Sequence, residues 1–144
     1  MAVESKTRLT SLYIFYVVNE MLVPYMKKVT DKIHELGYTC ELHSCGHLLN
    51  LVQCIEAAGW DTWQGMTDIN DYHDVYGNLT SKLMMWTPAG NIKGLSKEET
   101  EAKAKAFVDE FGNKERSAVL TGSMPDNPDF YIEVYKLSRM KFGA

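Results

Sequence analysis

The stretch Thr39-Cys-Glu-Leu-His-Ser-Cys-Gly-His47 carries the most information about the fold. It is rich in strand-forming residues up to the glycine, and an apolar pattern with helical spacing follows at once. Because side chains alternate between the two faces of a strand, we expect Glu41, His43 and Cys45 to share one face. They would lie at the C-terminal end of a strand just before a helix, where α/β enzymes place their catalytic groups. The alternative is a histidine and a cysteine that pack between the strand and the helix.

The rest of the chain predicts the same alternation of strands and helices. The N-terminal segment, residues 1–18, has no definite assignment. Residues 1–10 are polar, and residues 12–18 are aromatic and β-branched and suit either a strand or the start of a helix. An amphipathic helix from residue 19 to Gly37 follows, and its apolar stripe consists of Val23, Met26, Val29, Ile33 and Leu36. Four strand–helix units come next, with strands over 39–45, 60–66, 79–87 and 117–124 and helices over 47–58, 69–76, 96–111 and 128–142. Ser96 with Glu99 predicts a capping box at the start of the third of these helices, and Asn127 with Pro128 predicts the start of the last one. Strands that alternate with helices indicate a parallel sheet.

The fold class that we expect is α/β, as half of a (β/α)8 TIM barrel. A complete barrel needs about 250 residues, whereas this chain has 144 and room for four parallel strand–helix units preceded by a helix. A small open sheet is the alternative. Depending on the register of the strands, the inner face of a half-barrel would carry apolar groups such as Met84, Trp86 and Leu120. We therefore expect a homodimer or a complementing N-terminal half to cover that face.

Composition excludes several classes of protein. The net charge is −4 with mixed signs along the chain, so no basic patch suggests nucleic acid. No run approaches the roughly 18 consecutive apolar residues of a membrane span. Three irregularly spaced cysteines argue against a disulfide framework. We expect one domain in the reducing environment of the cytoplasm.

Four segments bear on function: Leu22-Val-Pro-Tyr-Met-Lys-Lys-Val29, Ile33-His-Glu-Leu-Gly37, Leu42-His-Ser-Cys-Gly46 and Ile55-Glu-Ala-Ala-Gly-Trp-Asp61. They resemble the C-terminal half of the uroporphyrinogen decarboxylase superfamily, and most of all its corrinoid-dependent methyltransferase branch. The resemblance covers residues 19–144, and the spacing to Asp68 also fits. It implies a (β/α)8 barrel with the active site at the C-terminal ends of the strands, and it makes this chain the last four units.

The resemblance also implies a zinc site. In the methyltransferase branch the His-x-Cys pair of this strand supplies two zinc ligands, which correspond to His43 and Cys45. The third ligand is usually a cysteine at the end of the last strand, but here that place reads Thr121-Gly-Ser-Met124. Glu41, Asp68 or a group outside this chain would then complete the site. Asp68 is also the residue expected to bind substrate.

The activity that follows is a zinc-assisted transfer of a methyl group between a corrinoid carrier, held by a partner protein, and a small acceptor. Zinc would convert an acceptor thiol to a thiolate, or would polarise an ether oxygen in a demethylation. One alternative is decarboxylation of a tetrapyrrole, which requires arginines near the anionic ring; only Arg8, Arg116 and Arg139 occur. Another is a truncated fragment that dimerises and catalyses nothing.

The remaining histidines and cysteines have ordinary structural interpretations. Cys54 lies beside the apolar stripe of the second helix and is expected in the core. His34 and His73 fall within helices and are expected at the surface. His47 lies near a helix N-terminus, where an exposed side chain is expected.

Overall fold

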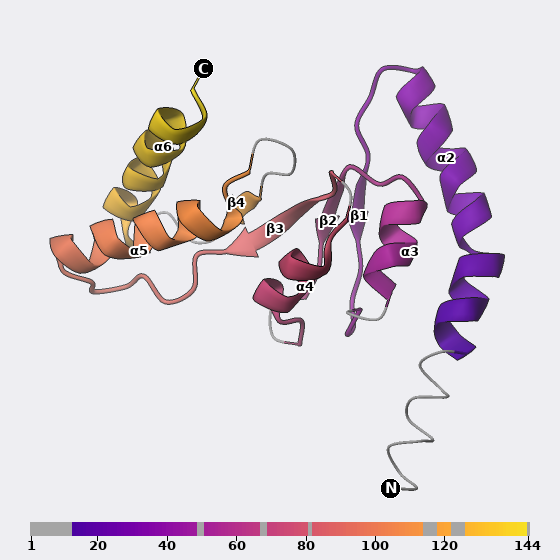
Figure 1. Ribbon diagram of the computed structural model, residues 1–144, viewed down its shortest axis with the longest axis horizontal. Coiled ribbons are helices and arrows are strands. Elements are labelled where there is room, and N and C mark those ends of the chain that lie inside the picture. Colours follow the sequence, from indigo (N-terminus) through magenta and orange to yellow (C-terminus); the bar gives the residue numbers. More distant parts are fainter. Residues whose placement is uncertain are drawn as a thin grey trace, which may run out of the picture. The chain divides into compact units, whose positions relative to one another are not determined.

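The chain is described by a computed structural model that covers residues 13–48, 51–66, 69–80, 82–113, 118–121 and 126–143 (Figure 1). Its labelled elements are α2 (Val23–Glu35), β1 (Glu41–His43), α3 (Val52–Ala57), β2 (Thr62–Gln64), α4 (Tyr72–Asn78), β3 (Met84–Pro88), α5 (Lys97–Phe111), β4 (Val119–Thr121) and α6 (Pro128–Phe142). Residues 13–21 are also helical, so the helical alternative holds there. The predicted order, a helix followed by four strand–helix units, is confirmed.

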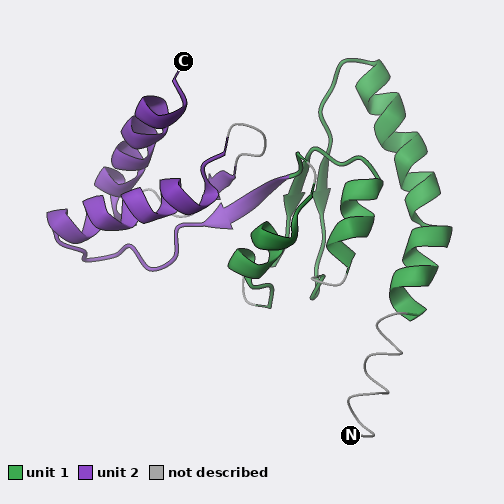
Figure 2. Ribbon diagram, viewed as in Figure 1, with its two compact units in different colours: residues 1–83 green, residues 84–144 purple. Residues whose placement is uncertain are grey.

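The chain divides into two compact units, residues 1–83 and residues 84–144 (Figure 2). The first, unit 1, holds α2, β1, α3, β2 and α4, and the second, unit 2, holds β3, α5, β4 and α6. Within unit 1, β1 pairs with β2 in parallel, and within unit 2, β3 pairs with β4 in parallel. The α/β class and the parallel pairing predicted from the sequence are therefore both confirmed.

The two faces of the β1–β2 pair in unit 1 differ sharply. Leu42 lies opposite Trp63 in the register, and the indole is fully buried. The Nε1–H of Trp63 donates a hydrogen bond to Ser44 Oγ at 2.7 Å. On the other face, Glu41 and His43 are exposed. The alternation predicted for this strand is confirmed, with one face packed and one face polar.

The contact between α2 and α3 corrects the apolar stripe predicted for the first helix. Val23 is buried and Met26 packs beside it, as the stripe predicts, but Val29 and Leu36 are 54% and 63% exposed, so the stripe was wrong at these two positions. Thr30 is fully buried instead, and its hydroxyl donates to the Ala58 carbonyl at 2.6 Å. A side chain at Gly59 would meet Thr30 Oγ1 at 3.1 Å, and the backbone there has a φ of +80°. Because the two helices approach closely, position 30 requires a small residue that can form a hydrogen bond. The hydrophobic periodicity of α2 does not predict that Thr30 is buried.

Unit 2 is held by helix caps and an aromatic core. The predicted capping box of α5 is confirmed, because Ser96 Oγ accepts from the Glu99 N–H and the Glu99 carboxylate accepts from the Ser96 N–H. Asn127 caps α6 through the Phe130 N–H, and Pro128 starts that helix, as predicted. The buried cluster between these helices and the loops consists of Ala89, Ile92, Ala104 and Phe130.

The β3–β4 pair of unit 2 corrects one residue of the predicted inner face. Thr87 is buried and pairs with Leu120, and Leu120 packs against the buried cluster of unit 2. The prediction that placed Leu120 on the same face as Met84 and Trp86 was therefore wrong. Met84 and Trp86 occupy the opposite face of β3 and are only partly buried, in agreement with the sequence prediction.

Candidate functional site

The predicted pair His43 and Cys45 lies together at the C-terminal end of β1. The Nε2 atom of His43 is 3.5 Å from Cys45 Sγ, and both side chains are exposed. The Nδ1 atom of His43 is 3.0 Å from Gln64 Oε1. Gln64 sits directly opposite His43 in the β1–β2 register, so the strand pairing itself aligns the imidazole.

These two side chains fit part of a zinc site. Tetrahedral zinc with sulfur and nitrogen ligands holds those two atoms about 3.5 Å apart, which the His43–Cys45 pair matches. A metal-bound histidine usually donates its other ring N–H to an oxygen acceptor, and Gln64 offers that acceptor. The donor atoms and the acceptor behind them are therefore compatible with zinc.

The third ligand predicted for this pair is not supplied by the described residues. Glu41 shares the face, but its Oε2 accepts a hydrogen bond from Thr62 Oγ1 at 3.2 Å. Over the described ranges, the one group of three metal-ligating side chains within mutual reach lies elsewhere and excludes Glu41. Asp68, predicted to bind substrate and possible as a ligand, lies outside the described residues. The structure thus brings two predicted ligands together and leaves the third to Asp68 or a group outside the chain.

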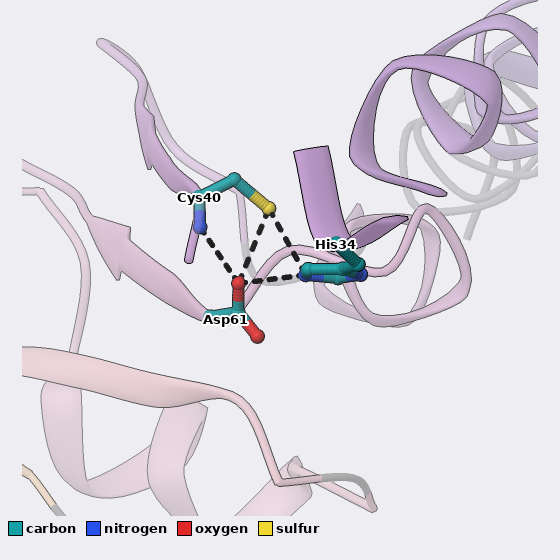
Figure 3. Close-up of side chains that lie close together, drawn as sticks. All are labelled: His34, Cys40 and Asp61. Carbon is teal, nitrogen blue, oxygen red and sulfur yellow. Dashed lines mark hydrogen bonds and ion pairs between the residues drawn. The ribbon is translucent and has the colours of Figure 1, made fainter. Parts of the chain in front are cut away.

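A second constellation, His34, Cys40 and Asp61, lies at the opposite end of the same strand pair (Figure 3). His34 belongs to the last turn of α2, Cys40 directly precedes β1, and Asp61 directly precedes β2. Parallel strands start side by side, and the Asp61 N–H donates to the Cys40 carbonyl at 3.1 Å. The fold therefore brings three segments of the chain to one point.

The side chains of this constellation form one hydrogen-bonded group. Asp61 Oδ2 is 2.8 Å from His34 Nε2, 3.3 Å from Cys40 Sγ and 2.7 Å from the Cys40 backbone N, which donates to it. Cys40 Sγ is also 3.5 Å from His34 Nε2. Figure 3 shows that these interactions converge on one carboxylate oxygen and one imidazole nitrogen.

The surroundings shift the pKa values of two of these groups. Burial alone would raise the pKa of Asp61, but hydrogen bonds from the Cys40 N–H, from His34 and from the Cys40 thiol outweigh it and lower the pKa. Burial, followed by the hydrogen bond to the Asp61 carboxylate, raises the pKa of the Cys40 thiol. Without a metal the thiol stays protonated near neutral pH and is a poor nucleophile.

This constellation was not predicted from the sequence. His34 was expected at the helix surface and is exposed there, and Cys40 lies outside the set Glu41, His43 and Cys45 that was expected to share one face. One signal was available: a helix and two successive parallel strands bring the last helical turn and the residue before each strand to the same edge. Cys40 and Asp61 occupy equivalent positions in that pattern, and His34 lies in that turn.

The remaining cysteine and histidines have the burial that the sequence predicts. Cys54 is buried, and burial raises the pKa of its thiol, so the core assignment is confirmed. His47 and His73 are exposed. Cys40, Cys45 and Cys54 are free thiols.

Comparison with models of protein families, with curated proteins and with solved structures found no match. Over the described ranges, no helix combines the length and the apolar character that crossing a membrane requires. The geometry and chemistry of the chain's own residues are therefore the basis for any functional proposal.

Proposed function

We propose that this chain forms half of a (β/α)8 barrel of the uroporphyrinogen decarboxylase superfamily and takes part in zinc-assisted methyl transfer. The methyl group would pass between a corrinoid carried by a partner protein and a small acceptor. The observation that supports this most is the placement of His43 Nε2 and Cys45 Sγ, 3.5 Å apart and exposed, at the C-terminal end of β1.

The architecture of each unit supports the barrel. Both strand pairs are parallel, and every strand is followed by a helix, which is the repeating unit of that fold. Each pair also keeps one face less buried, with His43 on β1 and Trp86 on β3. Four further units, from a second copy or from a complementing N-terminal half, would cover these faces.

The residues of unit 1 would have separate roles at this site. His43 and Cys45 would hold zinc, and Gln64 would fix the orientation of the imidazole through Nδ1. Bound zinc would lower the pKa of a coordinated acceptor thiol, which would then react as a thiolate. The exposure of the pair leaves room for a large carrier protein to approach. The free thiols agree with the reducing cytoplasm proposed for the chain.

The reaction itself would be a methyl transfer between cobalt and sulfur. The methylated corrinoid of the partner would supply the methyl group and keep the electron pair of its carbon–cobalt bond. The acceptor thiol, held by zinc at His43 and Cys45, would form the carbon–sulfur bond and release its proton to solvent. The corrinoid supplies the difficult chemistry, and the protein supplies binding and orientation.

The test combines zinc analysis with turnover of methylcobalamin and 2-mercaptoethanol, followed by the absorbance of the corrinoid. We expect His43→Ala and Cys45→Ser each to remove one zinc per chain and to abolish demethylation. Gln64→Ala should weaken zinc binding by about 10- to 100-fold, because the imidazole loses its oxygen acceptor.

Cys54→Ala is the matched control, because it removes a thiol of the same unit that lies in the core. It should leave zinc content and demethylation unchanged. Demethylation that persists in Cys45→Ser, or zinc content that is equal in wild type and in both site variants, would refute the proposal.

A further inference from the structure

We propose that His34, Cys40 and Asp61 form a second zinc site, at the N-terminal ends of β1 and β2, that joins the end of α2 to the start of both strands. This site does not depend on the methyl-transfer proposal, which concerns the other end of the strands. The constellation supplies three ligand atoms from three segments of the chain (Figure 3).

The distances between the ligand atoms support a metal. A tetrahedral zinc ion separates sulfur from nitrogen or oxygen ligands by about 3.5 Å. Cys40 Sγ lies 3.5 Å from His34 Nε2 and 3.3 Å from Asp61 Oδ2. The third edge, from His34 Nε2 to Asp61 Oδ2, is 2.8 Å and would lengthen by about 0.5 Å on binding. The exposed side chain of His34 leaves space for that change.

The same geometry argues against a catalytic triad. In a Cys-His-Asp triad, one imidazole nitrogen faces the thiol and the other faces the carboxylate. Here His34 Nε2 faces both Cys40 Sγ and Asp61 Oδ2. The three ligand atoms lie within 4.8 Å of one another, as the ligands of a metal do, and the imidazole does not bridge the thiol and the carboxylate through its two nitrogens.

Burial and donor type indicate which metal would bind. Cys40 is 6% exposed, whereas the side chains of His34 and Asp61 are 39% and 30% exposed, so the sulfur is shielded and solvent reaches the fourth position. A set of one sulfur, one nitrogen and one oxygen suits zinc and disfavours magnesium and calcium, which take oxygen ligands. Three protein ligands with a water in the fourth position are a common zinc arrangement.

The site would also have a structural consequence. Bound zinc would link α2, β1 and β2 within unit 1, so it would stabilise the folded chain relative to the unfolded chain. At a free zinc concentration of about a hundred times Kd, the melting midpoint of this 144-residue chain should rise by about 5 °C or more. Magnesium at the same concentration should leave the midpoint unchanged.

The test uses the full chain with His43→Ala and Cys45→Ser combined, so that the methyl-transfer site is already removed. We expect this double variant to retain one zinc per chain and the thermal shift. Cobalt(II) substituted for zinc should give the absorbance of a thiolate–cobalt bond. Adding Asp61→Asn, which keeps the size of the side chain, should abolish zinc binding and the shift while circular dichroism shows a folded chain.

The controls separate this site from the other one. Adding His73→Gln or Cys54→Ala to the double variant should leave the single zinc in place. A folded double variant that binds no zinc would overturn this inference and leave the methyl-transfer proposal standing. A wild type that binds one zinc, retained in the double variant and lost with Asp61→Asn, would support this inference and overturn the other.

Discussion

The two units of the chain differ in what their residues can do. All four histidines and all three cysteines fall within residues 1–83, and residues 84–144 contain neither type. Unit 2 instead has the capping box of α5, the Asn127 cap of α6 and a core around Phe130. Both proposed zinc sites would therefore lie in unit 1, and none of the residues proposed to bind zinc lies in unit 2. Variants in each unit should therefore separate stability from zinc binding.

The largest effect should come from Phe130→Ala in unit 2. Phe130 is fully buried and packs edge-on against Phe107 and Tyr131. Its truncation should lower the free energy of unfolding by about 3–5 kcal/mol in urea denaturation. Ile132→Ala, at a half-exposed position of the same helix, is the control and should cost much less. Loss of zinc binding in folded Phe130→Ala would show that the division between the units is wrong.

The second largest effect should come from Thr30→Val in unit 1. Valine keeps the shape of threonine but removes the hydroxyl that donates to the buried Ala58 carbonyl at 2.6 Å. The unpaired carbonyl should cost about 1–3 kcal/mol of stability, measured by urea denaturation. Val29→Ala, at the exposed neighbour, should change stability by about 0.5 kcal/mol or less. Equal losses in the two variants would mean that this hydrogen bond does not hold α2 against α3.

The capping box of α5 should give a smaller effect. Ser96→Ala removes the acceptor for the Glu99 N–H and should cost about 1 kcal/mol, measured as a lower urea midpoint. Ser96→Asp keeps an acceptor at that position and should restore most of the loss. A destabilised Ser96→Asp would indicate that packing, and not capping, explains the serine.

The smallest effect should come from Asp109, an exposed carboxylate between Lys105 and Lys141. Hydrogen bonds from these two lysines lower the pKa of Asp109 below its usual value. The carboxylate therefore stabilises the fold above its unfolded pKa of about 3.9, and the contribution is lost as the pH falls through the lower folded pKa. Acid titration of Asp109→Asn should lack this small loss, and high salt should reduce the difference from wild type.

Local signals in the sequence predicted much of the fold. Ser96 with Glu99 and Asn127 with Pro128 marked two helix starts, because capping depends only on neighbouring residues. Alternation along β1 placed Glu41 and His43 on one face correctly. The failures at Val29 and Leu120 have a different cause, since which face of an element is covered depends on partners distant in the sequence.

The two candidate sites also differ in whether neighbouring residues or distant segments of the chain form them. His43 is the last residue of β1 and Cys45 follows two residues later, so their proximity depends only on a short piece of chain. The constellation of His34, Cys40 and Asp61 joins three segments and depends on the pairing of β1 with β2. That pairing also explains the orientation of His43 by Gln64, which no spacing within one strand reveals.

The hydrogen bond between Trp63 and Ser44 gives the chain an optical reporter. Ser44 stands between His43 and Cys45, and the buried indole of Trp63 holds its hydroxyl from the packed side of the pair. Any displacement of this short piece of backbone alters the polarity around the indole. The emission wavelength of Trp63, one of three tryptophans in the chain, would thus follow the local conformation of the strand end without an added label.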